Sequence, residues 1–413
     1  MKTVRNIIGM SLLTSALLWA GDCNLQANPL DLDSLKGQSI FYGENSSRPD
    51  SLNSAELTAP EAAEAAEVLF KEYQKELKKN FGPEWGKKVL LKGDLKMPFD
   101  IRLFGEKPED GRSLYISMHG GGNAPKQLND SQWVNQISLY TPEEGVYIAP
   151  RAPFDDWNMW FRPEMDFFFD RLIQLAVIEL DVNPNKVYLM GYSAGGDGVY
   201  RMAPRMADRW AAASMMAGHP GDVSPLNLRN IGFSFWCGAN DSAYDRNKMT
   251  ESFEKKLAEL KENDPDGYTY EMHLQKGKGH WMDREDAAAI PWMVKFRRNF
   301  LPEKVAWRQE EADAMPLQFY WLAIPKEQAR KGATVIAKRG SNIITLEKCD
   351  YSELYILLND VMVDLNKPVT VLYNGKELFN GKVKRTLENI YDSIRDRGDQ
   401  DSIFSGKIKV EVK

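Results

Sequence analysis

Strand-like and helix-like segments alternate between residues 88 and 299, and this alternation restricts the possible folds more than any other feature of the sequence. Short apolar runs predict buried strands, and the longer segments between them have apolar residues at helical spacing. This order predicts an α/β core, a parallel sheet with helices on both faces. Sheets of this kind place their binding crevices at the carboxyl ends of the strands. The predicted strands are residues 88–92, 99–104, 113–118, 145–149, 186–190, 232–237 and 268–275, with a further apolar run at 211–217; the predicted helices are 167–180, a segment after residue 193, 249–262 and 287–299.

The segments on either side of this core differ from it. Residues 55–79 have apolar residues at helical spacing and predict a helix that the Gly82-Pro83 pair would end. From residue 318 onward the runs are short and β-rich, and the Asn374-Gly375 pair predicts a hairpin. A small sandwich-like accessory domain of about 95 residues is therefore expected at the C-terminus. Its predicted strands are 318–324, 333–337, 343–347, 353–358, 369–373 and 407–412, interrupted by one helix at 387–397.

The first residues have the pattern of a targeting segment. Lys2 and Arg5 precede an apolar run at about residues 7–20, and Ala27 ends a polar stretch suited to cleavage. The apolar run is shorter than the roughly 20 residues of a membrane span. We expect export to the periplasm or the medium, with no membrane span in the mature chain. The predicted organisation is a signal peptide at 1–27, a helical extension at 28–87, the α/β core at 88–302 and the accessory domain at 316–413.

The composition argues against several classes of function. The net charge of −6 gives no basic footprint for nucleic acid. No paired-cysteine or His-Glu-x-x-His spacing suggests a metal site, and no glycine motif suggests a nucleotide cofactor. Three cysteines do not form a disulfide framework, and we expect Cys237 and Cys349 to be buried free thiols. The sequence predicts neither a metal nor a cofactor.

The pentapeptide 191–195, Gly-Tyr-Ser-Ala-Gly, lies between the predicted strand 186–190 and a predicted helix. A sharp turn from strand to helix strains the backbone of the central Ser193, and glycines two residues to either side leave room for it. The turn would hold the hydroxyl at the edge of the sheet. In this setting the motif predicts a nucleophilic serine; a purely structural turn is the alternative.

A second glycine cluster, the run 119–122 (His-Gly-Gly-Gly), follows the predicted strand 113–118. Consecutive glycines let the backbone approach a substrate and offer N–H groups to a developing oxyanion. We expect Gly120 or Gly121 to supply one N–H and Ala194, which follows the nucleophile, to supply the other. An ordinary flexible loop is the alternative for the glycines taken alone.

A serine hydroxyl needs a base, and the chain has four histidines. His280 lies in a loop between the last predicted strand and the last predicted helix of the core, where a base is expected. His219 is the second candidate. His119 belongs to the glycine run, and His273 lies within a strand pattern that favours packing.

An acid that orients the base is expected after a strand between the serine and the histidine. Asp241 follows the predicted strand 232–237 and would lie at the edge of the sheet. Asp245 and, more distantly, Glu251 are the alternatives, because aspartates in loops also occur as solvated turn residues.

The order Ser193, Asp241, His280, after the glycine run 119–122, resembles the α/β-hydrolase superfamily over residues 88–301. Within it the chain is similar to secreted polyhydroxybutyrate depolymerases and feruloyl esterases. Dienelactone hydrolases and prolyl oligopeptidases are related families that it also resembles. The resemblance implies hydrolysis of a small or polymeric carboxylic ester through an acyl-enzyme, without a cofactor.

Aromatic residues are concentrated in residues 151–169, and Trp281 neighbours the expected base. They could line a substrate pocket or form the core of a small insertion. Trp160 and Trp281 are the expected pocket residues.

Two other functions are compatible with these motifs. A peptidase of the prolyl oligopeptidase type would use the same groups, but the segment before the core is too short for an upstream propeller. A non-catalytic binding protein on the same scaffold would be expected to lack the serine, the base or the glycine run, and this chain has all three.

Overall fold

The computed structural model describes residues 32, 36–37, 39–42, 52, 55–311 and 313–412. The signal peptide expected at residues 1–27 lies outside the described residues. In the described part of the chain, no helix has both the length and the apolar character needed to cross a membrane. The helices are α1 (Ala59–Gly86), α2 (Lys126–Ile137), α3 (Glu164–Leu180), α4 (Ala194–Arg205), α5 (Arg246–Asn263), α6 (Ala289–Met293) and α7 (Leu387–Arg397).

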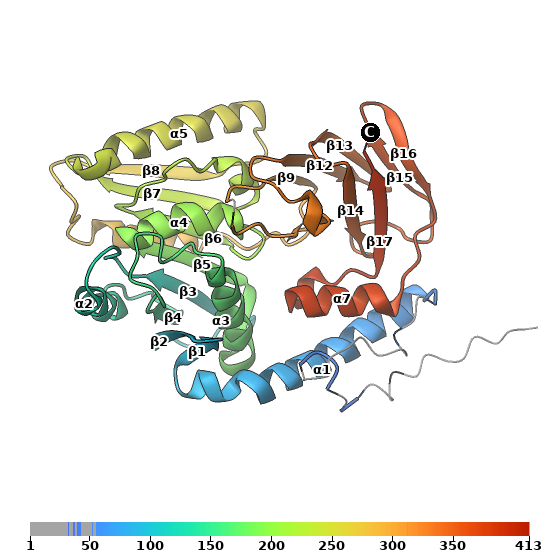
Figure 1. The fold of residues 1–413 in the computed structure, drawn as a ribbon, viewed down its shortest axis with the longest axis horizontal. Helices are drawn as coiled ribbons and strands as arrows, with labels where there is room; N and C mark the ends of the chain where they lie inside the picture. The colour runs from blue at the N-terminus through green and yellow to red at the C-terminus, as the bar shows by residue number, and fades with distance from the viewer. Residues whose placement is uncertain are drawn as a thin grey trace, which may run out of the picture.

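An eight-stranded sheet forms the core, in the strand order β1-β2-β4-β3-β5-β6-β7-β8 (Figure 1). All neighbouring strands from β4 to β8 pair in parallel. The edge strands β1 and β2 pair with each other, and β2 pairs with β4, in the antiparallel sense. The predicted α/β sheet is therefore confirmed, with an antiparallel edge. The strands are β1 (Val89–Lys92), β2 (Leu95–Phe104), β3 (Arg112–Met118), β4 (Gly145–Pro150), β5 (Val182–Tyr192), β6 (Ala212–Met216), β7 (Gly232–Gly238) and β8 (Tyr270–Gln275).

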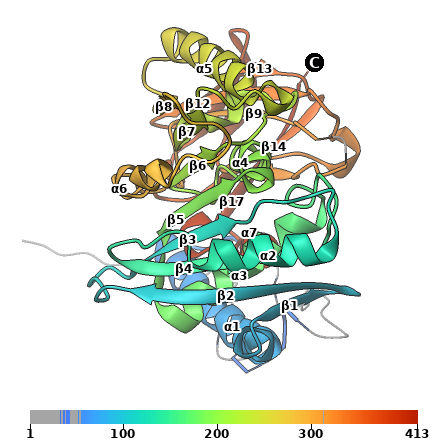
Figure 2. The same ribbon diagram turned by 90° about the vertical axis from the view of Figure 1, so that its left-hand side faces the viewer.

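Helices cover both faces of this twisted sheet (Figures 1 and 2). Because side chains alternate along a strand, neighbouring residues belong to opposite faces. Ile116 and Leu189 pack in the cluster that includes the side chains of α3, α4 and α5. Tyr115 and Tyr188 pack in the second cluster, against α2 and α6. Burial on both faces fixes the register of the central strands and holds their carboxyl ends in place.

Four local predictions were wrong or missing. Helix α1 continues through Pro83 to Gly86, because a proline near the end of a long helix removes only one hydrogen bond. The predicted strand 186–190 begins earlier than expected, because β5 starts at Val182. The predicted helix 287–299 is reduced to α6. After α6, the backbone N–H of Arg298 donates to the carbonyl oxygen of Asn185 in β5 and not to a residue of its own segment, so the chain there is not helical. Helix α2 was not predicted at all.

The β-rich C-terminal part consists of two sheets, ordered β10-β11-β14-β17 and β16-β15-β13-β12-β9. The strand β9 joins the second sheet although it lies before the expected boundary at residue 316. The predicted strand 318–324 is split into two short strands by a turn at Tyr320, which has a positive φ of 51°. The predicted hairpin at Asn374-Gly375 joins β15 to β16. The strands are β9 (Lys304–Arg308), β10 (Gln318–Phe319), β11 (Leu322–Ala323), β12 (Thr334–Gly340), β13 (Ile343–Cys349), β14 (Glu353–Leu358), β15 (Val369–Tyr373), β16 (Lys376–Gly381) and β17 (Gly406–Glu411).

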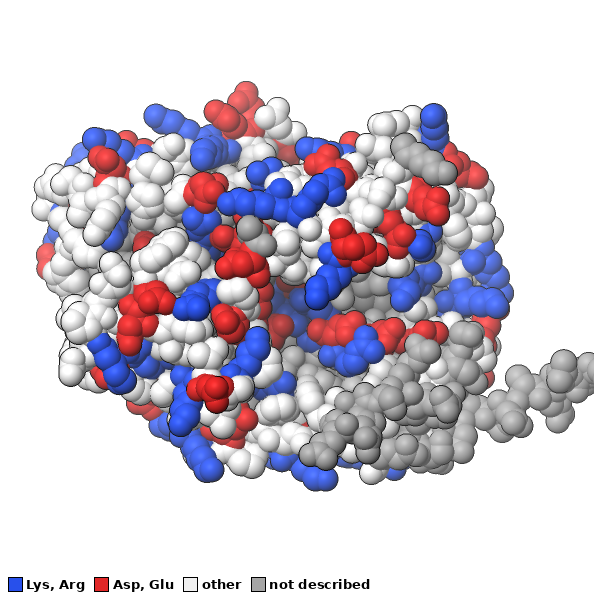
Figure 3. Space-filling model, viewed as in Figure 1, with Lys and Arg blue, Asp and Glu red and all other residues white. Residues whose placement is uncertain are grey.

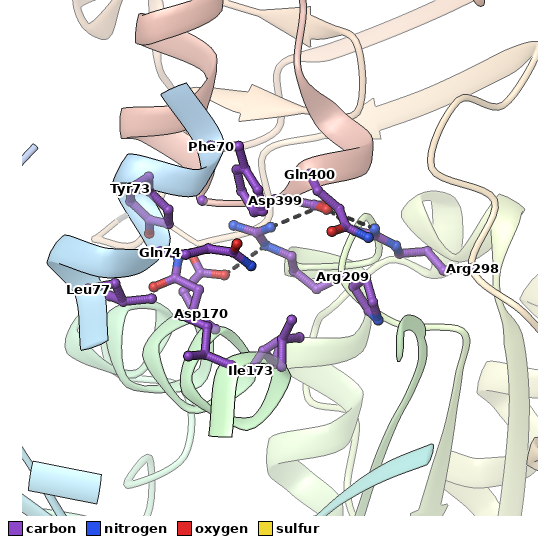
Figure 4. Close-up of a pocket in the computed structure, with 15 residues that line it drawn as sticks. Phe70, Tyr73, Gln74, Leu77, Asp170, Ile173, Arg209, Arg298, Asp399 and Gln400 are labelled. Carbon is purple, nitrogen blue, oxygen red and sulfur yellow. Dashed lines mark hydrogen bonds and ion pairs between the residues drawn. The ribbon is translucent and has the colours of Figure 1, made fainter. Parts of the chain in front are cut away.

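A buried ionic cluster joins the two parts of the molecule (Figure 4). Arg298 Nη2 donates to Asp399 Oδ1 at 3.0 Å, Arg209 Nη1 lies 3.4 Å from Asp399 Oδ2, and Arg209 Nε lies 2.7 Å from Asp170 Oδ1. Burial alone would raise the pKa of the Asp399 carboxyl, but the two guanidinium groups hold it well below its usual range. Helix α1 covers this cluster and packs against both α3 and α7 (Figures 1 and 4).

Candidate active site

Ser193 occupies a strained turn between β5 and α4, with φ 58° and ψ −119°. The glycines around it are required by close backbone contacts. A Cβ on Gly191 would lie 2.3 Å from the carbonyl oxygen of Gly195, and a Cβ on Gly195 would lie 2.1 Å from that of Met118. The sequence therefore folds into a sharp strand-to-helix turn that holds the Ser193 hydroxyl at the top of the parallel sheet.

The structure brings Ser193, His280 and Asp241 into contact. His280 Nε2 lies 2.9 Å from Ser193 Oγ, and His280 Nδ1 lies 2.7 Å from Asp241 Oδ2. Asp241 is buried, and the imidazole is partly exposed. The buried carboxylate favours the tautomer with a proton on Nδ1, which leaves Nε2 free to accept the serine proton.

Asp241 is held by the loop that follows β7. Its backbone N–H donates to Gly238, and its carbonyl accepts from Asn247 at 3.1 Å. Arg246 Nη1 lies 3.9 Å from Asp241 Oδ1 and places a positive charge behind the carboxylate. This neighbour was not identified from the sequence.

The alternative acids and bases lie elsewhere. Asp245 is exposed and pairs with Lys248, and Glu251 is exposed on α5. The ring of His273 stacks on Trp236, with centroids 3.8 Å apart. His219 lines a separate cleft beyond the glycine loop and does not reach Ser193 by any hydrogen bond among the described residues.

Tyr192, the residue before Ser193, holds the loop that carries His280. Its hydroxyl donates to the carbonyl oxygen of His280 at 2.6 Å and accepts from the N–H of Met282 at 3.1 Å. Two backbone contacts from one rigid side chain fix the loop on either side of Trp281. No sequence pattern indicates this contact, because its partners lie about ninety residues away.

The glycine loop lies directly against Ser193. A Cβ on Gly120 would lie 3.2 Å from the Ser193 Cβ, and Gly121 has a φ of 103°. Asn129 on α2 supports the loop, since its Oδ1 accepts from the N–H of Gly122 at 2.9 Å. Among the described residues, no hydrogen bond uses the N–H of Gly120, Gly121 or Ala194. These groups are the candidate oxyanion donors.

His119 has a structural position beneath this loop. Its Nε2 accepts from the N–H of Ala152 at 3.2 Å, and its Nδ1 lies 2.6 Å from the carbonyl oxygen of Gly120. Burial lowers the pKa of His119 to about 3, so the ring is neutral at ordinary pH. A neutral ring with both nitrogens bonded to the backbone fixes the shape of the loop.

An open cleft of about 610 Å³ contains Ser193 and His280; we call it the serine cleft. The exposed Trp281, one of the two expected pocket residues, lines this cleft. Helix α2 contributes the uncharged side chains of Gln132 and Asn135.

The predicted pocket role of Trp160 is wrong. Its side chain is 0% exposed, and its ring packs edge-on against His119 at 4.9 Å. The indole N–H donates to the carbonyl oxygen of His119 at 2.9 Å. Trp160 therefore supports the glycine loop from behind and does not face the substrate.

In the described part of the chain, no group of three or more His, Cys, Asp or Glu side chains could hold a metal ion. Cys237 is buried, and Cys349 is half-buried; both are free thiols.

Three solved structures illustrate what the chain is similar to. A thermostable esterase aligns with 19% identity over 51% of this chain and 64% of its own, at a TM-score of 0.37. A ferulic acid esterase aligns with 15% identity over 50% of this chain and 96% of its own, also at 0.37. A carboxylesterase from Mesorhizobium loti aligns with 17% identity over 50% of this chain and 99% of its own, at 0.35. No family model matches the sequence, and no curated protein does.

The topology of the chain itself identifies the fold of the core. The strand order is β1-β2-β4-β3-β5-β6-β7-β8, with β2 antiparallel. The serine turn follows β5, and the acid and histidine follow β7 and β8 in that order. The core of this protein has the α/β-hydrolase fold.

Proposed function

We propose that this protein is a serine hydrolase that cleaves carboxylic esters through an acyl-enzyme. The observation that carries the proposal is the chain of contacts from Ser193 Oγ through His280 to the buried Asp241. Such a chain turns a weak nucleophile into an effective one, because a base lies within hydrogen-bond reach and a third group orients that base.

Acylation begins when Ser193 Oγ attacks the ester carbonyl carbon. The hydroxyl proton passes to His280 Nε2, and the ionised Asp241 stabilises the imidazolium that forms. The bond to the alcohol oxygen then breaks, and that oxygen takes the proton from Nε2. The products of this half-reaction are the free alcohol and a serine ester of the acid.

Deacylation uses the same groups in the reverse order. A water molecule attacks the acyl carbon and gives a proton to His280 Nε2. Ser193 Oγ leaves as the carbon–oxygen bond breaks, and it recovers that proton. The acid is released with the enzyme unchanged, so the reaction consumes one water and requires no cofactor.

The N–H groups of Ala194 and of Gly120 or Gly121 would stabilise the negative oxygen of both tetrahedral intermediates. Removing one such donor from an oxyanion hole costs about 3–4 kcal/mol. The support of the glycine loop by His119 and Asn129 fits this role, since donors held in place need no rearrangement during the reaction.

The experiment that tests the proposal compares p-nitrophenyl esters, from acetate to octanoate, with p-nitroanilides of the same acids. We expect turnover of at least one ester and much slower cleavage of the anilides. Intact-mass analysis after treatment with a fluorophosphonate should show one adduct on Ser193. Absence of both turnover and labelling would contradict the proposal, and preferred cleavage of anilides would favour a peptidase.

We also propose that the chain is exported and cleaved near Ala27. The support is the charged and apolar pattern of the first residues. Expression of the full chain in a Gram-negative host, followed by N-terminal sequencing of the periplasmic and medium fractions, tests this. A cytoplasmic product that retains the first residues would contradict it.

The surface charge in Figure 3 bears on nucleic-acid binding. On the face drawn in Figure 3, acidic and basic residues are interspersed rather than gathered by sign. That face therefore offers no basic stripe along which a nucleic acid could bind.

A further inference from the structure

A second cleft of about 380 Å³ lies beyond the glycine loop from the serine cleft. It is lined by Gly121 and Ala194 and by residues that include Arg201, Arg246 and His219. We call it the arginine cleft. Gly121 lines both clefts, so the two meet at the candidate oxyanion donors.

The chemistry of the reaction assigns a part of the substrate to each cleft. His280 must protonate the departing alcohol oxygen, so the alcohol lies on the side of His280, in the serine cleft. The acyl group lies on the other side of the reacting carbon. The space there, past Gly121 and Ala194, is the arginine cleft.

Arg246 brings a nearly buried positive charge to this cleft. Among the described residues, its only hydrogen-bond acceptor is the carbonyl oxygen of Ala243, 3.3 Å from Nη1, and its buried Nε has no partner. The nearest carboxylate oxygen, on Asp241, is 3.9 Å from Nη1. A buried N–H without a partner carries a free-energy cost that a ligand oxygen could remove.

Arg201 adds a second charge, although its own N–H groups are occupied. Its Nη1 lies 2.9 Å from Glu311 and its Nη2 lies 3.0 Å from Asp222. Its guanidinium also lies 5.4 Å from the ring of Phe161. Arg201 therefore contributes to the potential of the cleft more than to direct binding.

His219 supplies an uncharged donor. Its Nδ1 accepts from the N–H of Gly221 at 2.9 Å, so the proton of the neutral ring is on Nε2. Burial, with Arg246 and Arg201 nearby, lowers the pKa of His219 and keeps the ring neutral.

Among the described residues, Asp197 is the one acidic residue that lines the arginine cleft. Its Oδ1 accepts from the backbone N–H of His219 at 2.6 Å, and burial raises its pKa to about 6. Two guanidinium groups and one carboxyl group therefore line this cleft. Outside the lining, Asp222 and Glu311 pair with Arg201, and Asp241 lies 3.9 Å from Arg246, so these carboxylates offset part of the positive charge.

Three aromatic residues, Trp157, Phe161 and Tyr244, also line the cleft. The rings of Trp157 and Tyr244 are 62% and 78% exposed, so apolar surface is available to a ligand at this cleft. Trp157 packs edge-on against Phe161, with centroids 5.3 Å apart. These rings suit an apolar acyl body, and the arginines suit an anionic end.

We propose that the arginine cleft binds an acyl group with an apolar body that ends in a carboxylate, and that Arg246 binds this carboxylate. The substrate class is then the monoester of a dicarboxylic acid. This inference rests on the proposed ester hydrolysis and adds the acyl specificity to it.

The test compares p-nitrophenyl monoesters of glutaric, adipic and suberic acid with neutral p-nitrophenyl esters of equal chain length. The measured quantity is the ratio of kcat/KM for the charged ester to that for its neutral partner. In the wild type we expect a ratio of at least about 10 at the best chain length. In Arg246→Gln we expect it to fall to about 2 or less.

The ratio separates the proposed binding role from any effect of Arg246 on Asp241, because a weakened triad slows both esters equally. Arg201→Gln should lower the ratio by a smaller factor. The matched control is Arg162→Gln, which removes an arginine paired with Asp156 outside the cleft and should leave the ratio unchanged.

The outcomes are distinct. If neutral esters are hydrolysed and no charged ester is preferred, the inference is overturned while the proposed function stands. If a preference exists but persists in Arg246→Gln, the carboxylate is bound elsewhere, and the inference is also overturned. If no ester of either kind is hydrolysed, the proposed function itself fails.

Discussion

At the scale of single residues, the candidate site depends on contacts that hold each reacting group in one position. Ser193 is held by its strained turn, and His280 by a loop that Tyr192 secures through two backbone hydrogen bonds. Displacement of a catalytic group by about 1 Å can lower a rate by about two orders of magnitude. Tyr192 is therefore a positioning residue, although it touches no reacting atom in the proposed mechanism.

Replacing Tyr192 with phenylalanine removes the hydroxyl and leaves the ring. We expect kcat for ester hydrolysis to fall about tenfold with little change in KM, since a typical hydrogen bond contributes about 1 kcal/mol and the loop becomes less ordered. The matched control is Tyr188→Phe, which removes a similar bond, to the carbonyl oxygen of Phe296, far from the serine. Equal kcat values in the two variants would contradict a positioning role.

The arginine cleft should respond to pH through Asp197, whose pKa is raised to about 6 by burial. Below that pH the carboxyl is neutral and no longer opposes Arg246 and Arg201. We expect the preference for carboxylate-ended esters to increase as the pH falls from about 7.5 to about 5.5. In Asp197→Asn the preference should be high and nearly independent of pH; a wild-type ratio that does not vary with pH would contradict this.

At the scale of elements, the sequence was most informative where local pattern and tertiary packing agree. The bounds of α7 were predicted correctly because Leu387, Ile390 and Ile394 form one buried face at helical spacing. The turn between β5 and α4 was predicted because only glycine fits at positions 191 and 195. The proximity of Ser193, Asp241 and His280 was predicted for a similar reason, since each follows a strand at the same edge of the sheet.

Other elements could not be predicted because distant residues determine them. Helix α2 has no apolar stripe, and the residues it buries are Asn129 and Gln136. Asn129 supports the glycine loop, so this support was missed with the helix. Trp160 was expected in the pocket because it belongs to an aromatic segment that follows a predicted strand. The sequence alone does not show whether such a residue faces the substrate or packs behind a loop.

At the scale of the whole molecule, the core and the C-terminal sheets are joined through buried charges rather than through apolar contacts alone. Asp399 lies beside both Arg298 and Arg209, beneath the helix α1 (Figure 4). Removing one member of such a group leaves an uncompensated charge away from water, which is strongly destabilising.

Asp399→Ala should therefore lower the free energy of unfolding by about 3–5 kcal/mol, measured by denaturant titration. Asp396→Ala, which breaks an exposed pair with Arg395, is the control and should cost less than about 1 kcal/mol. Because the folded pKa of Asp399 is depressed, its contribution is present above its unfolded pKa of about 4 and is lost as the pH falls below that value. Equal losses in the two variants would contradict the role of the cluster.

The most direct test of the central claim is the kcat/KM of the purified protein for its best p-nitrophenyl ester, compared with that of Ser193→Ala and His280→Ala. A nucleophile and its base act as a unit, so we expect each variant to lose at least about four orders of magnitude, while intact-mass analysis shows fluorophosphonate labelling of the wild type and none of Ser193→Ala. A Ser193→Ala variant that keeps its rate within about tenfold of the wild type would contradict the proposed mechanism.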